Sequence, residues 1–211
     1  DGDLAGGTER LRPEAVSGAQ LDQQEMPVGN ISLGPSDATV LREILVGSDR
    51  RIPSSFWNQG FHLSHDVPYG YLQNEGGCCG VLAVIQALVI ADVFGNRRLL
   101  TDDVFRAALV FAVRTVLCSA SSRGLQSVIV VFAPPTISDH HHHHHHSAVD
   151  ESRTVRDQLA FMSRLSKRCE FSSVAQLESF LATDVLKSWS EPRGQGLLCL
   201  LFSVLLSRGA Q

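Results

Sequence analysis

The hydrophobic and polar positions along the chain divide it into a polar leader and a body of helices and strands. Residues 1–35 are rich in Gly, Gln, Ser and Pro and have no sustained apolar period, so we expect a disordered leader there. The body, residues 36–211, begins with a short helix over 37–46 that Ser36 caps and Gly47 ends. The apolar residues of this helix form one stripe: Val40, Leu41, Ile44 and Leu45.

The most apolar helix is predicted over residues 80–94. Apart from Gln86 and Asp92 it is apolar on nearly every face, which is typical of a helix buried in the centre of a domain. A second helix is predicted from the N-cap Thr101 to about residue 118, because two aspartates follow Thr101 where carboxylates favour the helix dipole.

The second half of the body contains strands as well as helices. The β-branched run 125–132 predicts a strand. Residues 157–171 mix apolar and basic positions and fit a strand or a helix, of which we predict a strand. A serine-capped helix is expected to about residue 187, and a buried helix over 197–207 that Gly209 ends. Because helices outnumber strands, the predicted fold class is α+β.

A run of seven histidines, His140–His146, interrupts this pattern. Purification tags are normally terminal, so we predict an encoded low-complexity insert near 138–150. Neutral imidazoles are good metal ligands, and metal binding by the run is the alternative. We predict no functional metal site and no cofactor.

Composition and charge exclude several classes of protein. Apolar residues make up 44% of the chain and charged residues 19%, so a packed core is feasible. A net charge of -4 gives no basic surface for nucleic acid, and the apolar runs are too short to span a membrane. The five cysteines are odd in number and irregular in spacing, which fits a reducing compartment, the cytoplasm and also the nucleus.

One segment, residues 73–80, has the residue types for thiol chemistry. A thiol attacks as its thiolate, and a position in the first turn of a helix stabilises that anion. Cys79 would lie there, at the start of the apolar helix. Gly76, Gly77 and Gly80 would leave the approach bare, so that an extended peptide could lie close to the sulfur.

Nucleophilic attack on a carbonyl also needs hydrogen-bond donors for the developing oxyanion. Gln73, six residues before Cys79, could supply its side-chain amide. A tight glycine turn followed by an inert, buried cysteine is the alternative from spacing alone. The neighbouring Cys78 could be the nucleophile or a redox partner, although adjacent cysteines close only a small, strained ring.

The segment belongs to a longer motif that resembles the catalytic-cysteine region of the MINDY deubiquitinases, a family of papain-like cysteine peptidases. The residues that carry this resemblance are Phe56-Trp57-Asn58-Gln59-Gly60-Phe61, Tyr69 to Gly77, Cys79 to Ala87, and the apolar helix that ends in Ser207-Arg208-Gly209. The resemblance implies a papain-like fold, incomplete in residues 36–211. It also implies a central buried helix that carries the nucleophile at its N-terminus.

The same resemblance implies roles for single residues. Cys79 would be the nucleophile and Gln73 the oxyanion donor, while Trp57 and the glycines would bind the substrate. The family usually has proline where this chain has Cys78. Its general base is a histidine downstream of the Ser-Arg-Gly segment, so we expect that histidine beyond Gln211 and little activity from residues 1–211 alone.

Two histidines outside the homopolymer, His62 and His65, precede Cys79 and are the alternative bases. The function implied is hydrolysis of isopeptide bonds after the ubiquitin C-terminus, in polyubiquitin of the linkage that marks proteins for the proteasome. The alternative is a ubiquitin-binding pseudoenzyme without catalysis. In both cases ubiquitin is the expected partner, with no nucleic acid and no membrane.

Overall fold

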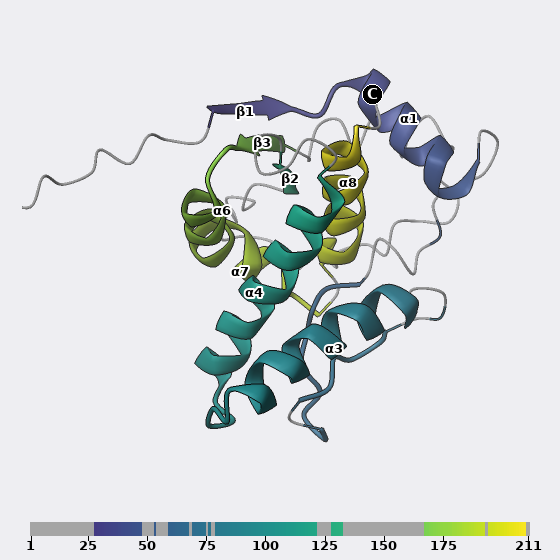
Figure 1. Cartoon of the computed structure of the whole chain (residues 1–211). Coiled ribbons are helices and arrows are strands. Elements are labelled where there is room, and N and C mark those ends of the chain that lie inside the picture. Colours follow the sequence, from purple (N-terminus) through teal and green to yellow (C-terminus); the bar gives the residue numbers. More distant parts are fainter. Residues whose placement is uncertain are drawn as a thin grey trace, which may run out of the picture.

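The computed structural model describes residues 28–47, 53, 59–67, 69–74, 76, 79–121, 128–132, 167–192 and 194–209. In these ranges a three-stranded antiparallel sheet lies at one end of a group of helices (Figure 1). In chain order the elements are β1 (Val28–Ser32), α1 (Pro35–Val46), α3 (Cys79–Gly95), α4 (Asp102–Ala120), β2 (Val128–Phe132), β3 (Lys167–Phe171), α6 (Val174–Phe180), the π-helical η2 (Leu181–Val185), α7 (Leu186–Trp189) and α8 (Gly196–Arg208). The mixture confirms the predicted α+β class.

The sheet has the strand order β1-β3-β2 and is covered on both faces at β2. Val130 of β2 lies opposite Cys169 of β3, and Ile31 of β1 lies opposite Arg168. Side chains alternate between the two faces of a strand. Val130 therefore joins the cluster around α3 and α4, whereas Val131 joins a second cluster with α1 and α8.

Helix α4 occupies the middle of the helical group and packs against α3, α6, α8 and β2 (Figure 1). Its N-cap is Thr101, whose hydroxyl accepts a hydrogen bond from the Val104 N–H at 3.4 Å. This confirms the predicted start of the helix. Its buried side comprises Phe105, Ala108, Leu109, Ala112, Val113 and Leu117.

Helix α3 is less buried than its pattern predicts. Figure 1 shows it at the end of the molecule opposite the sheet. Val84 is 54% exposed and Phe94 51% exposed, so the prediction of a central buried helix is wrong for the described residues. An apolar pattern reports the character of each helix face, but it does not report whether a neighbour covers that face. The buried residues of α3 are Leu82, Ile85, Val89, Asp92 and Val93.

The disordered leader was predicted to extend to residue 35, but the structure has a strand from Val28 onward. Residues 1–27 lie outside the described ranges. Strand β1 pairs with β3, and Leu33 directly after it is buried. Helix α1 then begins at Pro35, with Gly34 rather than Ser36 at the N-cap position. Proline suits the first turn of a helix because the N–H that it lacks would have no partner there.

Of the two helices predicted at the C-terminal end, one is divided in the structure and the other is continuous. The one expected to about residue 187 is divided into α6, η2 and α7. The other is confirmed as α8, which ends at Gly209 with a positive φ of 98°. The strands predicted in 125–132 and 157–171 are confirmed over β2 and β3. Their parts at 125–127 and 157–166, and the insert near 138–150, lie outside the described residues. No helix within the described ranges has the length and apolar character needed to cross a membrane.

Candidate active site

Cys79 is the first residue of α3, and its side chain is exposed. The first N–H groups of a helix have no partner inside the helix, and together with the helix dipole they stabilise an anion nearby. A thiol must lose its proton to become a nucleophile. The position of Cys79 therefore suits a nucleophilic thiol, and its catalytic role stays a prediction.

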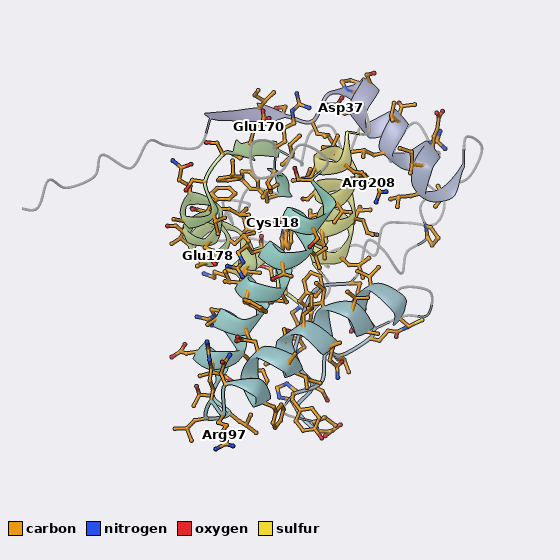
Figure 2. The ribbon with its side chains drawn as sticks, viewed as in Figure 1. Asp37, Arg97, Cys118, Glu170, Glu178 and Arg208 are labelled. Carbon is orange, nitrogen blue, oxygen red and sulfur yellow. The ribbon has the colours of Figure 1, made fainter. Side chains whose placement is uncertain are left out.

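The other described cysteines are less accessible. Cys169 and Cys199 are each 3% exposed and lie in the core, and Cys118 is half-buried on α4 (Figure 2). Burial raises the pKa of the Cys118 thiol above its ordinary value. Among the described cysteines Cys79 is the exposed one, whereas Cys78 lies outside the described residues.

The predicted substrate-binding residues are only partly within the described ranges. Gly76 and Gly80 are exposed, and a Cβ placed on either would meet no atom within 4 Å. Packing therefore does not require glycine at either position. Gly77 and Trp57 lie outside the described residues.

Gln73 is exposed in the loop that leads to α3. The residues on either side of it are held by Gln59, whose side chain is fully buried. Gln59 Oε1 accepts a hydrogen bond from the Asn74 N–H at 2.9 Å, and Gln59 Nε2 donates to the Leu72 carbonyl oxygen at 2.9 Å. The loop is thus fixed to the interior immediately before and after the predicted oxyanion donor.

The chain before this loop forms a small hairpin. Leu63 and Tyr71 form an antiparallel bridge, and the Leu72 N–H donates to the His62 carbonyl oxygen at 2.8 Å. This pairing brings the backbone of His62, one of the two alternative bases, beside the residue that precedes Gln73. The His62 and His65 rings contact each other edge-on, with centroids 5.8 Å apart.

The hairpin is also tied to α3. Gln86 Oε1 on α3 accepts a hydrogen bond from the Tyr71 N–H at 3.4 Å, and Tyr69 meets Phe94 edge-on at 6.0 Å between centroids. Burial raises the pKa of the Tyr71 phenol well above its ordinary value, so this side chain stays neutral. These contacts hold the hairpin against the helix that carries Cys79.

The base of the hairpin packs against the turn between α7 and α8. The Phe61 N–H donates to the Trp189 carbonyl oxygen at 2.8 Å, and the Leu197 N–H donates to the Gln59 carbonyl oxygen at 2.9 Å. A Cβ on Gly60 would collide with the carbonyl oxygens of Glu191 and Trp189. Only glycine permits so close an approach of two backbones.

The chain matches the family model of the deubiquitinating enzyme MINDY-3/4, conserved domain, over residues 42–211. The chain belongs to the MINDY-3/4 deubiquitinase family. No curated protein and no solved structure matches the chain. Membership of the MINDY-3/4 family implies deubiquitinase function and a ubiquitin substrate.

The matched range of the MINDY-3/4 domain includes the hairpin, α3 and α8. It also includes Gln59 and Gln86. The sequence did not predict the hydrogen bonds that these two side chains make in the site. Gln86 could have been singled out because it is a polar residue in an otherwise apolar helix. Gln59 could have been singled out because it is an amide in a segment of aromatic residues and glycine. Within the described part of this MINDY-3/4 domain, no group of three or more His, Cys, Asp or Glu is arranged to hold a metal ion.

Proposed function

We propose that this MINDY-3/4 domain is a cysteine-type hydrolase that cleaves the isopeptide bond after the C-terminus of ubiquitin. Cys79 is the nucleophile and Gln73 an oxyanion donor, within a papain-like fold. The observation that carries the proposal is the exposed thiol of Cys79 on the first residue of α3. It occurs in a chain whose family consists of deubiquitinating enzymes.

In the proposed reaction the Cys79 thiolate attacks the carbonyl carbon of the last ubiquitin residue, and a carbon–sulfur bond forms. The carbonyl electron pair moves to oxygen, where the Cys79 N–H and the Gln73 amide donate hydrogen bonds. The oxyanion then collapses, the carbon–nitrogen bond breaks, and the lysine amine leaves with a proton from the general acid. Water hydrolyses the resulting thioester and restores the thiol.

Substrate selection is proposed to depend on the residues around the turn before α3. Gly76, Gly77 and Gly80 would flank the Gly-Gly tail of ubiquitin, and Trp57 would line the groove. The open space at Gly76 and Gly80 supports this proposal, since a bound tail could use it. The proposed substrate is polyubiquitin of the linkage that marks proteins for the proteasome.

The general base is proposed to be a histidine downstream of the segment Ser207-Arg208-Gly209, as the family resemblance implies. His62 is the alternative, since its backbone pairs with Leu72 beside Gln73.

The test uses ubiquitin that carries an electrophile at its C-terminus. We expect covalent capture by the wild-type protein and no capture by Cys79→Ala. Cys78→Ala is the matched control, because it removes the adjacent thiol and should still be captured. Capture that survives Cys79→Ala and is lost in Cys78→Ala would contradict the assignment of the nucleophile.

Binding without capture would contradict the enzyme and favour a ubiquitin-binding pseudoenzyme. Such a protein would bind ubiquitin with the same affinity whether or not Cys79 is present. We propose a reducing setting for the activity, in the cytoplasm and also the nucleus, and the described cysteines are all free thiols. Loss of capture under reducing conditions would argue against that setting.

A further inference from the structure

The buried side chain of Gln59 makes three hydrogen bonds, two of them to the chain on either side of Gln73. A neutral amide has two N–H donors and a carbonyl oxygen that accepts. Gln59 Nε2 donates to the carbonyl oxygens of Gly60 at 2.6 Å and Leu72 at 2.9 Å, and Gln59 Oε1 accepts from the Asn74 N–H at 2.9 Å. Hydrogen bonds are stronger in the protein interior than in water, so these three bonds fix the positions of the backbone groups that Gln59 contacts.

Two of these bonds act on the two peptide groups that flank one residue. The Leu72 carbonyl belongs to the peptide group before Gln73, and the Asn74 N–H belongs to the peptide group after it. Holding both groups restricts φ and ψ of Gln73, because these two angles set the orientation of one peptide group relative to the other. One side chain therefore restricts the backbone from which the Gln73 amide extends.

Gln59 can act in this way because its own backbone is anchored in the core. Its carbonyl oxygen accepts a hydrogen bond from the Leu197 N–H in the first turn of α8. The next residues pack against the turn after α7, and the Asn74 side-chain amide donates to the Pro192 carbonyl oxygen. The loop is thus fixed to α7 and α8, which are separate from the helix that carries Cys79.

We propose that Gln59 is the positioning residue of this site, and that its buried amide orients Gln73 as an oxyanion donor before the substrate arrives. The inference rests on the proposed function. A donor that is fixed in advance stabilises the transition state without reorganisation, and a displacement of about 1 Å costs up to about 100-fold in rate. Gln59 does not touch the reacting atoms and acts through Gln73.

The test compares two reactions of the complete protein that differ in their need for an oxyanion donor. Isopeptide hydrolysis passes through a tetrahedral oxyanion. Capture by ubiquitin with a C-terminal alkyne does not, because the sulfur adds to a carbon that bears no oxygen and the neighbouring carbon takes a proton from water. We expect Gln59→Met to lower kcat for hydrolysis by about 10- to 100-fold with little change in KM, and to keep the rate of alkyne capture.

Ser203→Ala is the matched control, since it removes a buried hydrogen bond at the sheet and should leave both reactions unchanged. Equal losses of hydrolysis and capture in Gln59→Met would overturn the inference, as would unchanged hydrolysis. A wild-type protein that performs neither reaction would instead overturn the proposed function, and the inference with it. The two failures are therefore distinguishable.

A second variant applies where Gln59→Met does not fold. In Gln59→Glu the neutral carboxyl group can donate to Leu72 and accept from Asn74, whereas the carboxylate can only accept. Burial raises the pKa of such a carboxyl, to about 8–9 in extreme cases. Hydrolysis by Gln59→Glu relative to wild type should therefore rise as the pH falls from about 8.5 to about 6. A ratio that is constant with pH would overturn the inference.

Discussion

The hydroxyl of Ser203 on α8 accepts a hydrogen bond from the Val131 N–H on β2 at 2.7 Å. One turn later, Ser207 accepts from the Ile129 N–H at 2.9 Å. Four residues of a helix and two residues of a strand both advance by about 6–7 Å, so the two serines match successive outward N–H groups of the strand. Because β2 pairs with β3 on its other side, these bonds close an edge of the sheet that would otherwise carry unpaired backbone groups.

Replacing Ser203 by alanine should therefore destabilise the protein. The Val131 N–H would be buried without a partner, and we expect the free energy of unfolding to fall by about 1–3 kcal/mol. Chemical denaturation followed by circular dichroism measures this change. Ser179→Ala is the control, because Ser179 is exposed on α6 and its loss should change stability by no more than about 0.5 kcal/mol. Equal stability of the two variants would contradict the role of Ser203.

Gly60→Ala should destabilise the protein for a different reason. The added Cβ would collide with the backbone carbonyl oxygens of Trp189 at the end of α7 and of Glu191 in the turn after it, and backbone atoms cannot move aside as a flexible side chain can. We expect a loss of about 1–3 kcal/mol or more, measured by the same denaturation experiment. Gly76→Ala adds a Cβ that meets no atom within 4 Å, so it should unfold like the wild type. A stable Gly60→Ala would refute the close approach.

The elements that the sequence predicts well are those with local signals. Helix α4 has its N-cap at Thr101 and a regular apolar stripe, and α8 ends at Gly209 in the left-handed conformation. Both signals lie within a few residues of the feature they predict. For this reason the start of α4 and the end of α8 agree with the sequence.

The features that the sequence did not predict depend on contacts between distant parts of the chain. Strand β1 is held by β3, which follows far along the sequence, and its own residues have no strong strand pattern. The exposure of α3 depends on which neighbours cover it, which periodicity does not report. The start of α3 could be predicted to within one residue, at 80 against the observed Cys79, since the glycines before it in the sequence are a local signal. The contacts of Gln59 with Leu72 and Asn74 could not, since they form only when the hairpin closes.

Gly80→Ala separates a requirement of the fold from a requirement of the substrate. Gly80 lies in α3 with open space around its Cβ position, so alanine should keep or slightly raise stability, by up to about 1 kcal/mol. If the ubiquitin tail passes close to Gly80, the new methyl group should lower kcat/KM for polyubiquitin by about tenfold or more. Gly95→Ala, at the other end of α3 and equally open, should leave the kinetics unchanged. Identical kinetics in the two variants would show that the tail does not pass Gly80.

The reactivity of Cys118 should depend on the charges around it. Burial raises the pKa of its thiol, Arg114 opposes this change, and Glu178 adds to it. A raised pKa means less thiolate at a given pH, so alkylation by a small reagent should begin at higher pH than for an ordinary cysteine. Glu178→Gln removes a negative charge and leaves Arg114, its partner at 2.8 Å, uncompensated, so the alkylation profile should shift to lower pH. Arg114→Gln should shift it to higher pH. Mass spectrometry of the Cys118 peptide gives both profiles, and shifts of the same sign in the two variants would rule out this electrostatic account.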